Sequence, residues 1–249
     1  MVFENILNII FAPLLKLPPL WAVILLAFLV SITIILITKY TTDQALMKKL
    51  KDDIKAYQKQ IKELKSEPKK AMEMQKKAME LNMKYMMHSL KPTIITFIPI
   101  ILIFGWMSSI FAYESTKPQQ EFSISVFLEK NADGNIELIA PEEIRVVDDK
   151  LKKIENDKAV WTLKGAEGEH IIEFVYDGEN QQKAVLITNG NKYIEPTKKI
   201  NGSRIKTIQI DYKPRKLLNL FGWKIGWLGT YIIFSIIFTM ALRKIIKVY

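Results

Sequence analysis

The sequence predicts an α-helical membrane protein with three transmembrane helices, a cytoplasmic antiparallel coiled-coil hairpin, and an extracytoplasmic all-β insert of immunoglobulin-like size. Three observations predict this class. First, residues 17–38, 92–113 and 225–242 contain no charged residue, and about 20 apolar residues span a bilayer. Second, Lys and Arg are concentrated between the first two of these stretches. Third, short alternating strand-like runs separated by turn signals fill the region between the second and third stretches.

The N-terminal region, residues 1–16, is expected to form an amphipathic segment at the membrane interface, because its apolar residues recur at helical spacing. A frayed terminus is the alternative. Pro18 and Pro19 then break the chain at the start of the first transmembrane helix, 17–38. A cleaved signal peptide is disfavoured, because the region carries no net positive charge and the apolar stretch is too long.

Residues 39–91 are expected to form a hairpin of two helices. The first helix has a seam of apolar residues at heptad spacing: Leu50, Ile54, Tyr57, Ile61 and Leu64. A break at Ser66-Glu67-Pro68 precedes the second helix. Its expected seam consists of Met72, Met79, Met83, Met86 and Leu90. Facing seams predict an antiparallel coiled coil that continues into the first and second transmembrane helices.

Methionine is concentrated in the second helix of this hairpin. Methionine is unbranched and polarizable, and it suits surfaces that accept varied apolar partners. The candidates for contact with hydrophobic segments of other proteins are Met74, Met79, Met83, Met86 and Met87. For Met79, Met83 and Met86 a role in the seam is the favoured interpretation, whereas Met74 and Met87 lie outside the expected seam.

Lysines of the hairpin are candidates for contact with anionic lipid or ribosomal RNA. They are Lys48, Lys49, Lys55, Lys59, Lys69 and Lys70. A solvated helix face that also sets the topology explains them at least as well.

The charge distribution predicts the orientation in the membrane. The chain carries +10 overall, and the positive excess lies in residues 39–91 and in the tail 243–249, whereas 114–216 is nearly balanced. Loops rich in Lys and Arg stay in the cytoplasm. With three crossings, the N-terminus and residues 114–216 are therefore expected outside and the C-terminus inside the plasma membrane.

Residues 114–216 predict a β domain. Seven short runs read as strands: 121–128, 136–139, 143–147, 159–163, 170–176, 184–188 and 204–210. Turn signals such as Asp133-Gly134 and Asp177-Gly178 separate several of them. This count suggests a sandwich of immunoglobulin-like size, with Trp161 in its core. Asn201-Gly202-Ser203 fits an N-glycosylation acceptor, although a hairpin turn explains it equally well.

The third transmembrane helix is expected within residues 217–242, with an amphipathic lead-in. None of the three spans contains a charged residue or a histidine, which argues against proton relays and ion-coupled transport. Hydroxyl side chains in the spans are candidates for a polar groove, with helix packing as the alternative: Ser31, Thr33, Thr96, Ser108, Ser109 and Thr230.

The sequence offers no catalytic constellation. There is no cysteine, and the two histidines, His88 and His170, are expected on opposite sides of the membrane. Phosphate-binding glycine loops, zinc-binding His pairs and nucleophile elbows are missing as well. We therefore expect no enzymatic activity, no cofactor, no metal and no DNA partner.

The combination of the 17–38 span, the basic hairpin, and a Met-rich end that runs directly into the second span resembles the YidC/Oxa/Alb insertase superfamily. The archaeal YidC-like branch is the most similar. The stretch that carries much of the resemblance begins at Met72 and reads MEMQKKAMELNMKYMMHSLKPTIITFIPIILIFGW. Two features depart from bacterial members, which carry an arginine in the groove and a large outer domain before the core.

The resemblance implies an insertase or chaperone that works without nucleotide hydrolysis. Such proteins accept client segments at a cytoplasmic hairpin and pass them through a polar intramembrane groove. The implied partners are newly made membrane proteins and the bilayer, with ribosomes or targeting factors as further candidates. Two alternatives stay open: a membrane-anchored scaffold or receptor that acts through the β domain, and a small ion channel.

Overall fold

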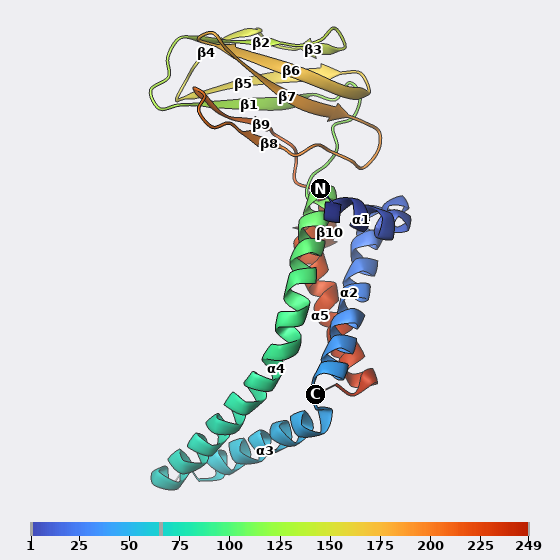
Figure 1. Ribbon diagram of the computed structural model, residues 1–249, viewed down its shortest axis with the longest axis vertical. Helices are drawn as coiled ribbons and strands as arrows, with labels where there is room; N and C mark the ends of the chain where they lie inside the picture. The colour runs from blue at the N-terminus through green and yellow to red at the C-terminus, as the bar shows by residue number, and fades with distance from the viewer. Residues whose placement is uncertain (1, 65–66, 249) are drawn as a thin grey trace. The chain divides into compact units, whose positions relative to one another are not determined.

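The structure is a computed structural model that describes residues 2–64 and 67–248. It divides into two compact units (Figure 1). The helical unit comprises Met1–Trp106 and Leu217–Tyr249, and the β unit comprises Met107–Lys216.

The helical unit contains the three apolar helices that the sequence predicts. Its elements are α1 (Val2–Phe11), a 3₁₀ helix η1 (Ala12–Lys16), α2 (Pro19–Thr41), α3 (Gln44–Glu63), α4 (Pro68–Phe111) and α5 (Trp227–Ile246). Among the described residues, α2, α4 and α5 are long and apolar enough to cross a membrane. Pro92 and Pro99 lie inside α4, which continues through both of them.

The two arms of the hairpin join the transmembrane helices differently. α4 runs without interruption from the hairpin into the second apolar stretch, as expected. α2 instead ends at Thr41, and a new helix starts after Asp43, whose Oδ1 accepts hydrogen bonds from the N–H groups of Ala45 (2.9 Å) and Leu46 (3.0 Å). A side chain at this N-cap position satisfies N–H groups that have no partner within the helix. The first arm is therefore a separate helix.

On α3 the less exposed face contains the predicted seam residues. On α4 the less exposed face is displaced by about one residue from the predicted seam. All five predicted seam residues of α3, from Leu50 to Leu64, are buried or half-buried. On α4 the expected seam residues are exposed, with Met72 at 62% and Met79 at 64%. The residues turned inward there are Ala71, Met74, Ala78, Leu81, Tyr85 and Ser89. The two arms separate with distance from their turn (Figure 1), so a coiled coil along a shared seam stays a prediction.

The segment before α5 differs from a simple amphipathic lead-in. It forms a β-hairpin of β10 (Lys216–Leu220) and β11 (Trp223–Gly226), which pair with each other as a two-stranded sheet. β11 runs directly into α5, because Gly226 is the N-cap residue of that helix.

The β unit is a sandwich of two antiparallel sheets. One sheet has the order β3-β5-β1-β9-β8 and the other the order β4-β2-β6-β7. The strands are β1 (Phe122–Leu128), β2 (Asn135–Ile139), β3 (Ile144–Val146), β4 (Leu151–Lys153), β5 (Lys158–Gly165), β6 (Gly168–Tyr176), β7 (Glu179–Ile187), β8 (Thr197–Lys199) and β9 (Ile205–Ile210). Each of the seven predicted runs overlaps a strand, and β4 and β8 are additional.

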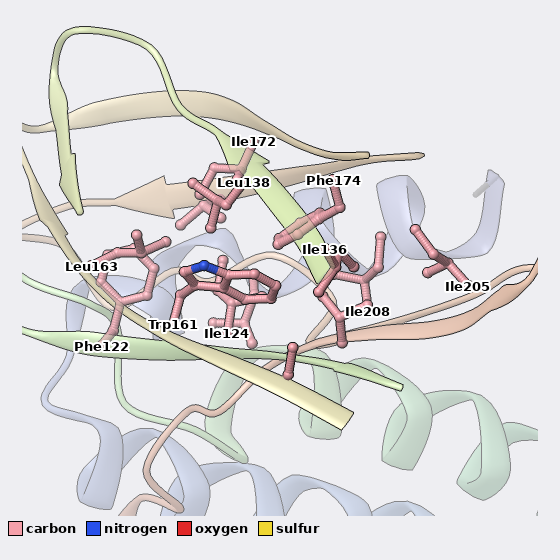
Figure 2. Close-up of a cluster of buried hydrophobic side chains, with 14 of the residues drawn as sticks. Phe122, Ile124, Ile136, Leu138, Trp161, Leu163, Ile172, Phe174, Ile205 and Ile208 are labelled. Carbon is pink, nitrogen blue, oxygen red and sulfur yellow. The ribbon is translucent and has the colours of Figure 1, made fainter. Parts of the chain in front are cut away.

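Apolar side chains from both sheets form the core of the sandwich (Figure 2). Trp161 of β5 is completely buried, as predicted, and its ring lies 5.4 Å from that of Phe174 on β6 in the other sheet. Residues 201–203 form a bend in which Asn201 and Gly202 are exposed, Ser203 is buried, and Gly202 has φ +76°. That geometry fits the turn interpretation, and glycosylation of Asn201 stays a prediction.

Candidate functional site

The main candidate site is an apolar cavity between α2 and α4. Its volume is about 280 Å³. Five lining residues belong to α2, four to α4 and one to α1: Leu29, Val30, Thr33, Ile34, Ile37, Thr96, Pro99, Ile100, Ile103 and Phe11. An apolar cavity of about 150 Å³ in another protein binds benzene. The volume here is therefore sufficient for one or two large apolar side chains.

The cavity exists because α2 packs along α5 instead of α4. The contact between α2 and α5 is the most extensive one between helices of the described residues. The rings of Phe28 and Phe238 meet edge to face at 5.4 Å. Ser31 lies between the two helices, with its hydroxyl 3.5 Å from the carbonyl oxygen of Ser235 and from the hydroxyl of Thr239. The face of α2 that carries Leu29 and Thr33 is left without a helix packed against it.

α4 is attached to the rest of the helical unit near the end of its apolar part. The ring of Phe104 lies 4.9 Å from Tyr231 and 6.2 Å from Trp227 of α5. The indole N–H of Trp106 donates a 2.7 Å hydrogen bond to the side-chain oxygen of Asn8 on α1. Only 22% of the most apolar 18-residue stretch of α4 is buried. Further from this end, α4 lines the cavity and buries Pro92 and Thr96, whereas most of its other apolar residues are exposed.

The cavity is open to its surroundings on one side. Leu29 is 38% exposed, and Thr33 and Pro99 are exposed as well. Neighbouring residues of α4 that point away from the cavity, Ile98 and Ile101, are 66% and 52% exposed. In a helix that crosses a bilayer, such side chains face lipid. The surroundings of the opening are therefore apolar on the α4 side.

The polar groups in the cavity wall are few and mostly satisfied. The hydroxyl of Thr33 donates to the carbonyl of Leu29 at 2.8 Å. The hydroxyl of Thr96 donates to the carbonyl of Pro92 at 3.0 Å and lies 3.1 Å from that of Thr93. Both donors are thus used within their own helices, and each hydroxyl oxygen still has lone pairs that can accept.

Pro99 adds one further polar feature. Proline has no backbone N–H, so the carbonyl of Ile95 has no i→i+4 partner in α4. In a nonpolar environment an unpaired carbonyl is an attractive hydrogen-bond acceptor. Ile95 is not among the lining residues, so the wall itself is an uncharged apolar surface whose polar side chains are Thr33 and Thr96.

The structure brings only two of the six predicted groove hydroxyls together in this cavity, Thr33 and Thr96. Ser31 lies in the contact between α2 and α5. Thr230 is fully buried in the first turn of α5 and donates to the Gly226 carbonyl at 2.9 Å. Ser108 and Ser109 are exposed near the end of α4, in the β unit. The cavity is consequently less polar than the expected groove.

The methionines of α4 form an exposed apolar surface instead of a packed seam. Four of the five candidates are about half exposed or more: Met79 (64%), Met83 (53%), Met86 (49%) and Met87 (59%). Met74 is half-buried on the inward face of the helix, the reverse of its expected position off the seam. The exposed methionines are therefore available to partners without any rearrangement.

The six candidate lysines are all exposed, on α3 for the first four and at the start of α4 for Lys69 and Lys70. Lys59 lies 4.0 Å from Glu63, and Lys70 lies 2.5 Å from Glu67. The first pair lies on α3, and the second lies at the start of α4. Exposed pairs of this kind contribute little stability, so the lysines stay accessible to anionic partners.

Most of the lining residues of the cavity escaped the sequence analysis. Val30, Ile34, Ile37, Ile100 and Ile103 have the same apolar character as residues that face lipid. Their spacing of three and four along each helix is the only available signal, and lipid-facing residues share it.

The part of the chain that the structure describes contains no cluster of His, Asp or Glu that could hold a metal ion. His170 is buried on β6, with its Nε2 3.0 Å from the carbonyl of Ala166. His88 is exposed on α4. Both positions fit structural or surface roles.

Three long apolar helices, an apolar cavity that is open on one side between two of them, and a β insert fit an integral membrane protein. Residues 8–127, slightly less than half of the chain, match the family model described as integral membrane protein EMC3/TMCO1-like. That family belongs to the Oxa1/YidC/Alb3 insertase superfamily. The match includes all of α2, α3 and α4 and supports an insertase-type or related membrane protein. The comparisons with curated proteins and with solved structures found no match.

Proposed function

We propose that this protein is a membrane-protein insertase whose client segments pass along the cavity between α2 and α4. The observation that carries the proposal is the combination of this open apolar cavity with the absence of an extensive helix contact to α4 among the described residues, in contrast to the long contact between α2 and α5. Apart from Pro92, Thr96 and the contacts near Phe104, α4 buries few of its apolar side chains, so it can move aside with a limited loss of packing.

The proposed pathway begins at the hairpin. The exposed methionines of α4, Met79, Met83, Met86 and Met87, bind apolar client segments, because flexible methionine side chains adapt to different partners. α4 leads without interruption from these residues to Thr96 and Ile100 in the cavity wall. A client segment can therefore follow one helix from the hairpin to the bilayer.

The energy for insertion comes from the client itself. Transfer of an apolar segment into the bilayer is favourable by a few tenths of a kcal/mol for each Leu, Ile, Val or Phe residue. The hydroxyl oxygens of Thr33 and Thr96 in the cavity wall can accept hydrogen bonds from only a few polar groups of a client at a time. This mechanism needs neither nucleotide nor cofactor and suits clients with short translocated tails.

The proposal includes an orientation and a location. The lysine-rich hairpin and the end of α5, with Arg243 and Lys244 in its last turn, face the cytoplasm. The N-terminus and the β unit then lie outside the plasma membrane. Newly made membrane proteins are the proposed partners, delivered by ribosomes or targeting factors.

A matched pair of variants tests the cavity. Ile100→Trp places a large side chain in the cavity, whereas Ile101→Trp adds the same volume on the exposed face of the same helix. The full-length protein is reconstituted in liposomes, and insertion of a single-span client with a short tail is measured by protease protection. Ile100→Trp is expected to reduce insertion at least fivefold, and Ile101→Trp to leave it within twofold of the unsubstituted protein.

Equal insertion by both variants would overturn the assignment of the cavity. If neither the variants nor the unsubstituted protein inserted the client, while the β unit still bound a partner protein, the scaffold function would be favoured. Client-independent ion flux through the same liposomes would favour the channel.

A further inference from the structure

The β10–β11 hairpin has an unusual tip. Its two central residues, Phe221 and Gly222, have φ angles of +51° and +93°. Positive φ at both positions is typical of the tight type I′ turn, which favours Asn-Gly or Asp-Gly. The side-chain oxygen of Asn219 braces the turn by accepting a 3.0 Å hydrogen bond from the N–H of Gly222.

Phe221 is a poor residue for this position on conformational grounds. A bulky side chain at positive φ is a genuine outlier, because its Cβ crowds the backbone. The side chain is also fully exposed, at 108%, so it gains almost no burial within the chain. Trp223 is 72% exposed and Leu220 is 38% exposed. The tip thus exposes three large apolar side chains, and burial within the fold does not compensate for the strain at Phe221.

The length of α5 places this tip near the membrane surface. Between Trp227, the first residue of α5, and Leu242 the chain has no charged residue, and this stretch is about 24 Å long in a helix, shorter than the hydrocarbon core of about 30 Å. Arg243 and Lys244 mark the opposite end. The N-terminal end of α5 must therefore lie at the edge of the hydrocarbon core.

The hairpin cannot lie far from that edge. Gly226 is both the last residue of β11 and the N-cap of α5, so no linker separates the two elements. β10 and α1 lie at the same end of the helical unit (Figure 1). Aromatic side chains, Trp and Tyr above all, are enriched where the hydrocarbon core meets the headgroups.

We propose that the β10–β11 hairpin is a membrane anchor that inserts Phe221 and Trp223 among the lipid headgroups and upper acyl chains beside α5. Lipid is the occupant because the hairpin is continuous with an apolar helix long enough to span a membrane and carries a fully exposed aromatic residue five positions before the N-cap of that helix. The anchor fixes the height of α5, whose uncharged helical stretch is shorter than the hydrocarbon core. The inference depends on α5 crossing the bilayer and not on the insertase function.

Site-directed spin labelling tests the depth of the tip, since the chain has no cysteine. Phe221→Cys carries the nitroxide, in full-length protein in phosphatidylcholine–phosphatidylglycerol liposomes. Collision rates with oxygen, which partitions into lipid, are compared with those of a water-soluble nickel chelate. Ile237→Cys, which is 53% exposed on α5, serves as the lipid reference, and Asp149→Cys on the β unit as the aqueous reference.

The label at 221 is expected to have an oxygen-to-nickel collision ratio at least fivefold above that at 149. A ratio equal to that at 149 would place the tip in water and overturn the proposal. Protection from both reagents would indicate a protein partner and would overturn it as well.

A second pair of variants separates anchoring from folding. Phe221→Asn creates an Asn-Gly turn that suits type I′ better, so the hairpin itself should form at least as well. Phe221→Leu keeps an apolar tip. With the label on Lys224→Cys, the Asn variant is expected to lower the oxygen-to-nickel ratio at least threefold and the Leu variant to leave it within 1.5-fold. An unchanged ratio in the Asn variant would show that Phe221 does not anchor the hairpin.

Discussion

The indole N–H of Trp106 on α4 donates a hydrogen bond of 2.7 Å to the side-chain oxygen of Asn8 on α1. The ring of Phe11, also on α1, lies 5.0 Å from that of Trp106. Phe11 lines the cavity, so the contact with Trp106 joins the cavity wall to the end of α4. α1 therefore closes one end of the proposed client path.

Trp106→Phe tests this closure. It keeps an aromatic ring beside Phe11 and removes the hydrogen bond to Asn8. A hydrogen bond of this kind contributes about 1 kcal/mol, so opening of α1 should become roughly fivefold more frequent. Hydrogen exchange of the α1 amides in reconstituted protein measures that frequency. Asn8→Ala should have a similar effect, and the double variant should add little to either single one. Fully additive effects would mean that the two side chains do not act through this bond.

The exposed methionines predict where clients first bind. Single cysteines at Met79 and at Met83, which are 64% and 53% exposed, should form cross-links with the apolar segment of a client. A cysteine at Met74, half-buried on the inward face of α4, should react several-fold less. Because the chain has no cysteine of its own, cysteine-directed cross-linking to ribosome-bound client chains of increasing length measures these contacts directly. Cross-links should appear only after the apolar segment has emerged; equal yields at Met74 and Met79 would contradict the proposed surface.

The sequence predicts the register of one hairpin helix and not of the other. On α3, apolar residues occupy a single stripe among Lys and Asp, so the inward face follows from periodicity. α4 has two apolar stripes: Ala71, Met74, Ala78 and Leu81 on one, and Met72, Met79, Met83 and Met86 on the other. Periodicity favours the more hydrophobic stripe, but the helix turns the one with small residues inward. Small side chains allow closer approach of neighbouring helices, which a count of hydrophobic residues ignores.

The β unit and the cavity likewise combine features that the sequence predicts with features that it does not. The seven predicted strands alternate apolar and polar residues and have turn signals beside them. β4 and β8 have only three residues each, two of them lysine, and lie at the edges of their sheets. The cavity residues, such as Ile34 and Ile100, are identical in character to residues that face lipid. Only the packing of α2 on α5 distinguishes them, and that packing is a property of the folded chain.

The interactions of Asp148 predict that the stability of the β unit depends on pH. Burial alone raises the pKa of its carboxyl, but hydrogen bonds from the Lys152 ammonium and the Thr162 N–H, with the charge of Lys152, lower the pKa below its ordinary value. A carboxyl with a lowered pKa in the folded state stabilises the fold above the pKa of the unfolded chain, about 4. This stabilisation is lost as the pH falls through the lower, folded-state pKa.

The expected result is that Asp148→Asn lowers the stability of the β unit at pH 7 and has a smaller effect below pH 3. Urea unfolding of the full-length protein in detergent, followed by near-UV circular dichroism at both pH values, measures the difference. Asp149→Asn is the matched control, because Asp149 is an exposed neighbour. Equal losses of stability for Asp148→Asn at both pH values would show that the effect is steric and not due to charge.

The close packing around Gly165 predicts that the sandwich cannot accept a larger side chain at this position without a change in structure. A Cβ atom at this position would lie 2.4 Å from Cδ1 of Ile144 and 2.9 Å from the backbone oxygen of Glu143. The isoleucine tip can rotate, but the backbone of Glu143 is tied to this region, because its carbonyl accepts a 3.1 Å hydrogen bond from the N–H of Ala166. Gly165→Ala must therefore separate β3 from β5, and overpacking of this kind costs about 1–3 kcal/mol.

Hydrogen exchange of the β3 and β5 amides in the full-length protein should detect this change as faster local opening, by roughly five- to a hundredfold over that range of free energy. Gly190→Ala is the matched control, because a Cβ there would meet only the hydroxyl of Thr188, at an ordinary contact distance of 3.5 Å. Its exchange rates should stay within twofold of the unsubstituted protein. If Gly165→Ala behaved like Gly190→Ala, the close approach of Glu143 and β5 would have to relax at almost no cost, and β3 would be a loosely held edge of the sheet. The faster exchange expected here instead follows from a strand held in register by its pairing with β5, which leaves no room for a methyl group.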